Sequence, residues 1–311
     1  MMDRFPGMDV TSLEFVSKIA DHLFLLKGPN RSKFPFSNGF LLTGDKTVLI
    51  DAGIGKERIR DLDRVKRIDS LIISHSHPDH ILAWHYLKDR ELIIPSETPK
   101  AVHDLRLLGQ RFVKHPEGAR RWSWYAEKKL GIRSMGYPDE RFEDGKILDF
   151  GTVRLRAIHT PGHLDDHYCF FELNSKTLLT TDIDFTGFGP WYGNPEGDIH
   201  EFKLSIEKIR SIGFETLCSS HKDPIPKNAA DHAFKQYLSA FDRQRQVIYD
   251  HCDPPRSLDQ LLEISPFYRN RFVDNLLQRV FEEQMIQKNL DILLEDGRLI
   301  RNGDDYRQVV S

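Results

Sequence analysis

Short apolar runs separated by polar turns open the chain and predict β-strands. Three of them lie around residues 23–26, 40–43 and 47–50, and Gly, Asn or Asp bounds most of them, as is typical of strands. A polar, helix-prone stretch follows at 56–67, and another apolar run comes at 71–73. This alternation of strand and helix predicts an α/β fold in which helices cover the sheets.

The second half of the chain repeats this order of elements. Strand-like runs lie at 153–158, 168–172 and 177–180, and a helix predicted at 199–212 precedes a further strand at 215–219. The sequence therefore predicts two strand-rich halves, each flanked by helices.

A helical insert is predicted between these halves, at about 98–141. Val102, Leu105 and Leu108 lie at helical spacing within it. Residues 100–141 contain ten Lys or Arg and five Asp or Glu, a local net charge of +5 (10 − 5). We interpret this charge as a solvated helical face. The alternative is a lid that helps to hold an anionic substrate.

The composition turns helical after Pro226. A long amphipathic helix is predicted at 228–252, and helices followed by a hairpin around Asn302-Gly303 give the outline of a winged helix. We therefore divide the chain into a catalytic domain, residues 1–226, and a helical linker with a winged-helix-like domain, residues 227–311.

Bulk composition limits the class of protein. The 311 residues are 39% hydrophobic and 29% charged, with a formal net charge of −3, so a core can be buried without a basic excess typical of nucleic-acid binding. Three cysteines without a close pair favour a reducing compartment. No apolar run approaches the ~18 residues that a membrane span needs, and the N-terminus does not resemble a signal peptide. We expect a cytoplasmic protein.

Four ligand-type side chains lie within six residues, directly after the apolar run at 71–73. They are His75, His77, Asp79 and His80. Alternate residues of an extended segment point the same way, so His75 and His77 can reach one ion, and the bend that follows turns the other two toward a second ion. Imidazole and carboxylate are ligands suited to Zn²⁺, Fe²⁺ or Mn²⁺. Chance histidines on a polar loop are a much weaker explanation of an HxHxDH string.

Three further candidates each follow a predicted strand. They are His163 in a His-Thr-Pro-Gly-His run, Asp182 and His221. Active sites of α/β folds gather at the carboxyl ends of strands. Any one of these residues alone would more often be a hydrogen-bonded loop residue, but together they favour a metal site.

These residues in this order resemble the metallo-β-lactamase-fold hydrolase superfamily, in its glyoxalase II-like branch, over roughly residues 18–225. The resemblance implies an αββα sandwich with a metal site at one edge. It implies that two divalent ions bind, of which Zn²⁺ is our first choice and Fe²⁺ or Mn²⁺ the alternatives. The implied ligands of the first ion are His75, His77 and His163; those of the second are Asp79, His80 and His221; Asp182 bridges the two.

Other positions add detail to the resemblance. Asp51 matches the first acidic motif position, whose implied role is to orient a ligand. The run around Tyr192 resembles a substrate-side loop, although packing is the more ordinary role of such a tyrosine. Ile81-Leu82 and Thr181 depart from the family pattern, and these departures concern the shape of the site rather than its ligands.

The C-terminal module resembles the winged-helix appendage of one branch of this superfamily. Residues 255–311 carry eight Lys or Arg and ten Asp or Glu, whereas a DNA-reading wing carries a basic face. We therefore expect this module to serve in packing, in homodimer contact or as a cover of the site.

Together these observations predict a metal-dependent hydrolase that activates water against a small ester, thioester or lactone, with Asp79 and Asp182 orienting the nucleophile. Three alternatives stay open. They are a one-iron oxygenase of the persulfide dioxygenase type, a metal-dependent ribonuclease or phosphodiesterase, and a non-enzymatic nucleic-acid-binding protein. A small-molecule substrate is the expected partner.

Overall fold

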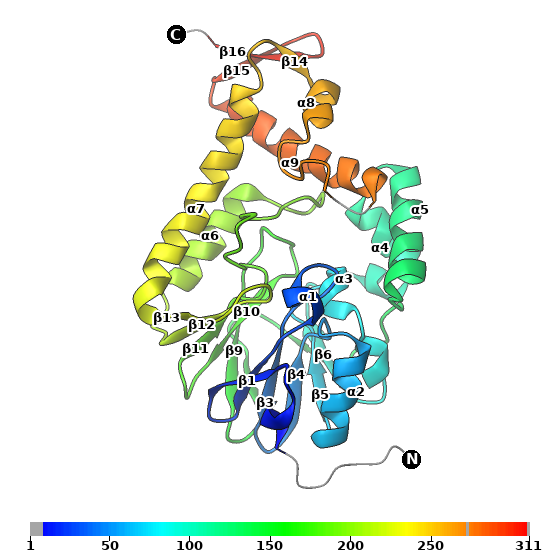
Figure 1. The fold of residues 1–311 in the computed structure, drawn as a ribbon, viewed down its shortest axis with the longest axis vertical. Coiled ribbons are helices and arrows are strands. Elements are labelled where there is room, and N and C mark those ends of the chain that lie inside the picture. The colour runs from blue at the N-terminus through cyan, green and yellow to red at the C-terminus, as the bar shows by residue number, and fades with distance from the viewer. Residues whose placement is uncertain (1–8, 272–273, 310–311) are drawn as a thin grey trace.

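The structure is a computed structural model that describes residues 9–271 and 274–309, and the strands of its two large sheets gather at one end of the molecule (Figure 1). The first sheet has its strands in sequence order: β1 (Val16–Ala20), β2 (Leu23–Leu26), β3 (Gly39–Thr43), β4 (Thr47–Ile50), β5 (Ser70–Ile72), β6 (Glu91–Pro95) and β7 (Glu140–Phe142).

The second sheet has the order β13-β12-β11-β10-β9-β8. Neighbouring strands are antiparallel except β11 and β12, whereas β4 to β7 of the first sheet run parallel. The strands are β8 (Ile147–Asp149), β9 (Arg154–His159), β10 (Tyr168–Glu172), β11 (Thr177–Leu179), β12 (Thr216–Cys218) and β13 (Ile225–Pro226).

The two sheets pack face to face through apolar side chains. Leu23 and Leu25 of β2 lie in the core between the sheets, together with Leu155 and Phe170 of the second sheet. Phe24, the residue between them, points to the opposite face, into the core under the outer helices. Both faces of β2 are apolar because both are covered, which explains why this strand is a continuous apolar run.

Helices cover the outer faces of both sheets, which confirms the predicted α/β fold. On the first sheet lie α2 (Lys56–Val65) and the insert of η3 (Lys100–His103), α4 (Leu105–Phe112), α5 (Pro116–Trp124) and η4 (Tyr125–Leu130). On the second lie α6 (Ile199–Arg210) and α7 (Lys227–Asp250). Shorter pieces are η1 (Val10–Ser12), α1 (Pro29–Ser32), α3 (Pro78–Ile81) and η2 (Trp84–Leu87).

Two basic side chains of the insert pair with acids elsewhere in the chain. Arg111 lies 2.5 Å from Asp165, and Arg121 lies 2.7 Å from Asp274. Arg106, Lys128 and Arg133 also form ion pairs. This pairing favours the interpretation of the insert as a solvated, structural face.

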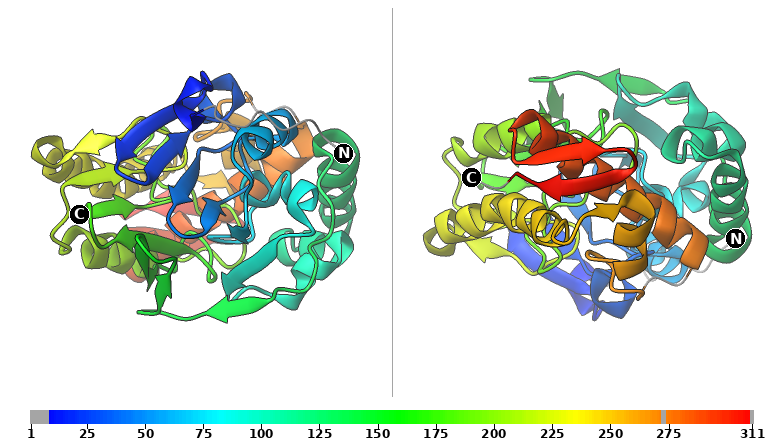
Figure 2. Two further views of the ribbon diagram at one scale, coloured as in Figure 1. Left: turned by 90° about the horizontal axis from the view of Figure 1, so that it is seen from below. Right: turned by 90° about the horizontal axis from the view of Figure 1, so that it is seen from above.

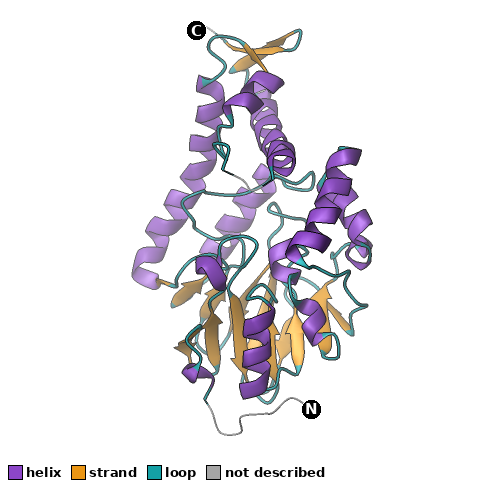
Figure 3. Ribbon diagram, turned by 45° about the vertical axis from the view of Figure 1, so that its right-hand side comes forward, coloured by secondary structure: helices purple, strands orange, loops and turns teal. Residues whose placement is uncertain are grey.

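The C-terminal module lies at the end of the molecule opposite the two large sheets (Figure 3). It contains α8 (Leu258–Ile264), α9 (Asn275–Glu295) and a three-stranded antiparallel sheet of β14 (Arg256–Ser257), β15 (Leu299–Asn302) and β16 (Asp305–Gln308). Viewed from above, α7, α9 and the small sheet lie over one end of the two large sheets (Figure 2).

This module has its own apolar core. Leu261, Leu290 and Leu299 are buried in it beside Ile248 of α7. The predicted hairpin is present, with Gly303 in a left-handed conformation at its turn. The winged-helix assignment and the domain boundary stay predictions. None of the helices in the described residues is long and apolar enough to cross a membrane.

Candidate metal centre

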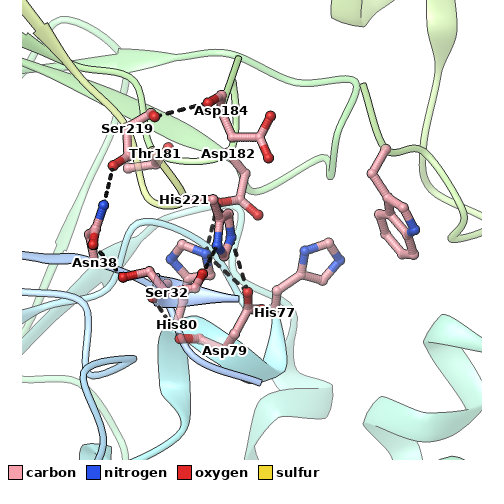
Figure 4. Close-up of polar contacts among 12 residues, drawn as sticks. Ser32, Asn38, His77, Asp79, His80, Thr181, Asp182, Asp184, Ser219 and His221 are labelled. Atoms are coloured by element: carbon pink, nitrogen blue, oxygen red, sulfur yellow. Dashed lines mark hydrogen bonds and ion pairs between the residues drawn. The ribbon is translucent and has the colours of Figure 1, made fainter. Parts of the chain in front are cut away.

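The predicted ligands meet at one edge of the two sheets, where several strands end. His75, His77, Asp79 and His80 follow β5, while Asp182 and His221 follow β11 and β12. Figure 4 shows five of these side chains, those of His77, Asp79, His80, Asp182 and His221. His163 follows β9. Four separate stretches of chain therefore converge because the carboxyl ends of their strands lie at the same edge.

A first group of ligand atoms comes from three histidines. The Nε2 atom of His163 lies 2.7 Å from Nδ1 of His77, and the Nε2 atom of His75 lies 3.2 Å from the same Nδ1. Asp182 Oδ2 lies 3.3 Å from Nε2 of His163. These side chains are buried.

A second group lies on the other side of Asp182. The Nε2 atom of His80 lies 2.9 Å from Oδ1 of Asp182, and Nε2 of His221 lies 3.4 Å from that oxygen. Asp79 Oδ2 lies 3.3 Å from Nε2 of His221. Each group brings its ligand atoms within 4.8 Å of one another, as the donors around one ion must be.

Asp182 is shared by the two groups in a specific way. Its Oδ2 atom faces His75 and His163, whereas its Oδ1 atom faces His80 and His221. A carboxylate with one oxygen toward each group has the geometry of a bridge between two cations.

The second ring nitrogen of each histidine in the second group is held by the N-terminal half of the chain. Nδ1 of His80 lies 2.7 Å from Oδ2 of Asp51, and Nδ1 of His221 lies 2.5 Å from the carbonyl oxygen of Ser32. Asp51 also accepts hydrogen bonds from the backbone amide and the hydroxyl of Ser74. Such contacts fix the ring orientation and leave Nε2 free to bind a cation.

The first group is supported partly by a different segment, residues 188–194. The carbonyl oxygen of Trp191 lies 2.8 Å from Nδ1 of His163. The side-chain amide of Asn194 lies 2.7 Å from Nε2 of His77. The third ligand, His75, has its Nδ1 atom 2.9 Å from the hydroxyl of Ser74. All five histidines thus have one nitrogen held and the other directed inward.

Burial and neighbouring charges act in opposite directions on these side chains. Burial lowers the pKa of His75 and His77 well below the usual value, so that both rings are neutral, the form that binds cations. Burial also acts to lower the pKa of His80, but the carboxylates of Asp182 and Asp51 outweigh it and hold that pKa well above its usual value. The second group therefore attracts positive charge.

Two buried atoms indicate what fits between these side chains. His80 Nε2 and Asp182 Oδ1 have no hydrogen-bond partner among the described residues, although they lie 2.9 Å apart. A buried polar atom without a partner is costly. Bound cations would pair both atoms, and the imidazole and carboxylate donors suit Zn²⁺, Fe²⁺ or Mn²⁺. The residues present therefore fit a dinuclear centre.

Tyr192, the substrate-side candidate, is packed inside the protein. Its ring is fully buried, and its hydroxyl donates to Gln244 Oε1 at 2.8 Å and accepts from Asn289 Nδ2 at 3.0 Å. This packing is the more ordinary role expected of this tyrosine from the sequence, and the substrate-side role stays a prediction. Its neighbour Trp191 is the aromatic residue beside the site, with its ring 5.2 Å from that of His77.

His167 is a site residue that sequence reasoning did not find. Its Nε2 atom accepts from the backbone amide of Asp182 at 3.1 Å and contacts the hydroxyl of Thr181 at 2.7 Å. Burial lowers the pKa of His167 to about 3, so this ring is neutral. It holds the backbone of the bridging aspartate. The Asp-Asp-His run shortly after His163 was the only available signal, and it carried no spacing typical of a ligand.

Comparison with known proteins identifies the family. A family model described as the metallo-beta-lactamase superfamily matches residues 33–221, more than half of the chain. The chain therefore belongs to the metallo-β-lactamase superfamily, whose members are mostly metal-dependent hydrolases.

Its relatives are distant. A solved metallo-β-lactamase family protein from Thermus thermophilus has a TM-score of 0.72 at 19% identity, with 94% of this chain and all of that chain (100%) covered. An atrochrysone carboxyl ACP thioesterase from Aspergillus fumigatus is 25% identical over 78% of this chain and 66% of its own. A hydroxyacylglutathione hydrolase from Francisella tularensis subsp. novicida is 31% identical over 47% of this chain and 46% of its own.

Proposed function

We propose that this protein is a hydrolase that uses two divalent metal ions to attack a small thioester, ester or lactone. One observation carries the proposal: Asp182 directs one carboxylate oxygen toward each of two groups of buried ligands. Relatives named as a thioesterase and as a hydroxyacylglutathione hydrolase support thioesters as the first substrate class to test, and with them the glyoxalase II-like branch.

The chain's own residues account for the positioning that this reaction needs. Two bound divalent ions, for which Zn²⁺ is the first choice, would supply a deprotonated water at neutral pH and polarise a carbonyl oxygen. Asp79 and Asp182 present carboxylate oxygens 3.3 Å and 3.4 Å from Nε2 of His221, where they can accept a hydrogen bond from the attacking water and orient it. His167 and Asp51 hold Asp182 and His80 in place.

The completeness of the second group favours hydrolysis over the one-iron oxygenase alternative. An oxygenase with a single ion does not need His80, His221 and Asp79 within 4.8 Å of one another. Phosphodiesters belong in the test because two-metal sites also cleave them.

Elemental analysis of the purified full-length protein, beside a panel of thioester, ester, lactone and phosphodiester substrates, tests the proposal. We expect about two ions per chain and turnover of a thioester or another small acyl ester. About one iron per chain with consumption of dioxygen would overturn it. Turnover of the phosphodiesters alone would overturn the substrate class.

A further inference from the structure

The 188–194 segment lies between the first ligand group and the C-terminal module. On one side, the Trp191 carbonyl contacts Nδ1 of His163 and the Asn194 amide contacts Nε2 of His77. This segment therefore reaches two of the three histidines of the first group. Metal affinity depends on such outer contacts, because they fix the ring and its tautomer.

Asn194 is chemically suited to orient His77. Nδ1 of His77 points at the first group, within 3.2 Å of Nε2 of His75, so a cation held there leaves the ring proton on Nε2. That proton needs an acceptor, and the side-chain oxygen of Asn194 provides one when the amide is turned by 180°, which exchanges its oxygen and nitrogen in place. Asn194 is almost fully buried, so water does not replace this contact.

The other side of the segment is fastened by helices α7 and α9. Lys288 donates from Nζ to the carbonyl oxygen of Tyr192 at 2.9 Å, and it donates to the carbonyl oxygen of Asn194 as well. The Tyr192 hydroxyl lies between Gln244 of α7 and Asn289 of α9. The side chain of Tyr192 is thus an anchor that points away from the metal centre.

Three further contacts tie the same segment to the rest of the C-terminal region. Trp191 Nε1 donates to the hydroxyl of Tyr268 at 2.5 Å, and the Trp191 ring packs against Phe281 of α9 with 5.6 Å between centroids. Gln244 Nε2 donates to the carbonyl oxygen of Pro190 at 3.2 Å. Contacts from outside the sandwich therefore hold Pro190, Trp191, Tyr192 and Asn194.

Lys288 is an unusual residue for a merely structural contact. Burial lowers its pKa to about 8, and the nearby Glu196 carboxylate partly offsets this effect. The folded protein therefore spends free energy to bury a charged ammonium at this position. Two backbone carbonyls accept from this ammonium. An ammonium placed there holds the backbone on both sides of Gly193, at the point where the chain turns toward His77.

We propose that the C-terminal module is part of the first metal site: Lys288 holds the 188–194 segment, and Asn194 and the Trp191 carbonyl transmit that restraint to His77 and His163. Asn194 and Lys288 are positioning residues for the first ion. This inference rests on the proposed two-metal centre, and it goes beyond it by assigning the module a role in metal affinity rather than in DNA recognition.

Metal binding by full-length variants tests the inference directly. The readouts are metal content after dialysis and affinity from competition with a chromophoric chelator, using Zn²⁺ alone as the probe. Asn194→Leu removes the acceptor, and we expect affinity for one of the two ions to fall by about 10- to 100-fold, the usual cost of losing such an outer contact. Asn194→Asp keeps an oxygen acceptor and should restore affinity to within a few fold of the wild type.

Lys288→Met removes the donors at nearly constant length and should weaken the same ion by about 10-fold. Lys288→Arg keeps the charge and should recover part of that loss. Arg279→Met is the matched control, because Arg279 lies on the same helix but pairs with the exposed Asp259. It should leave both affinities unchanged.

The outcomes separate the two proposals. Wild-type protein that binds fewer than two ions would refute the dinuclear centre itself. Wild-type protein that binds two ions, with Asn194→Leu and Lys288→Met binding both equally well, would overturn the inference alone. Equal loss of both ions, or loss in Arg279→Met as well, would also overturn it, since a general loosening of the fold is not specific to one ion. If Asn194→Leu does not fold, the comparison of Lys288→Met with Lys288→Arg tests the inference in its place.

Discussion

The two ligand groups of the metal centre are supported from different parts of the chain. The second group depends on Asp51 at the end of β4 and on Ser32, both within the N-terminal half. The first group depends on the 188–194 segment, which Lys288 and Asn289 of the C-terminal module hold in place. The two groups share Asp182, but the residues that hold their histidines come from different parts of the fold. The second is built into the sandwich, whereas the first also requires a module beyond it.

The largest effect is expected where the two groups meet. Asp182→Ala removes the shared carboxylate, so both ions should be lost. Turnover should then fall by more than about 1,000-fold, which is more than an enzyme loses with one preorganised hydrogen-bond donor. Elemental analysis and steady-state kinetics measure both effects. Circular dichroism should remain that of the wild type. A variant that retains both ions and full activity would contradict the bridging role.

The second largest effect is expected when a side chain that holds the second ligand group is removed. Asp51→Ala leaves the Ser74 amide and hydroxyl and the His80 ring without their buried acceptor. We expect the free energy of unfolding to fall by about 3 kcal/mol and the affinity for one ion to fall by about 10- to 100-fold. Urea unfolding and chelator competition measure these quantities. If the ion lost is the one weakened by Asn194→Leu, the separation of the two supports is wrong.

A buried carboxyl behind the first group should make stability depend on pH. Burial, helped by the neighbouring Asp165, raises the pKa of Asp166 to about 7. In the unfolded chain this carboxyl ionises near its usual pKa of 3.8, so folding must keep a proton on it or bury a charge. Its contribution to stability is complete below pH 3.8 and is lost as the pH rises through about 7.

Between about pH 5 and pH 8 the wild type should therefore lose about 3 kcal/mol more free energy of unfolding than Asp166→Asn. Urea unfolding at the two pH values in one metal-containing buffer measures the difference. Asp165→Asn should weaken this pH dependence in part, because the Asp165 charge helps to raise the pKa of Asp166. Equal pH dependence in the wild type and Asp166→Asn would show that this carboxyl does not titrate as expected.

The smallest effect is expected at Tyr192. Tyr192→Phe removes a hydroxyl that bonds Gln244 and Asn289, and should cost about 1 kcal/mol of stability with a few-fold weaker first ion. Because the ring is buried, KM should not change in metal-saturated protein. A large rise in KM at saturating metal would instead support the predicted substrate-side role of Tyr192.

The sequence by itself determined the fold class, and with the family resemblance it predicted the side chains that the structure brings together in two groups. Short apolar runs bounded by turn residues specify strands, and ligand-type residues directly after them identify the edge where the strands end. The His75–His80 string was informative because its neighbours in sequence are also neighbours in space. Asp51, which lies at the end of its strand, was predicted from the family resemblance rather than from local pattern.

Only the tertiary structure decided the roles of Tyr192, Asn194, His167 and Lys288. None of these residues carries a local spacing signal, because each acts through partners far away in the chain, as Lys288 acts on Asn194. Side-chain direction in an irregular segment follows from packing rather than from a regular period, so the sequence could place Tyr192 near the site without showing that its ring points away. Long-range packing therefore determined what holds the ligands, while short-range pattern determined what the ligands are.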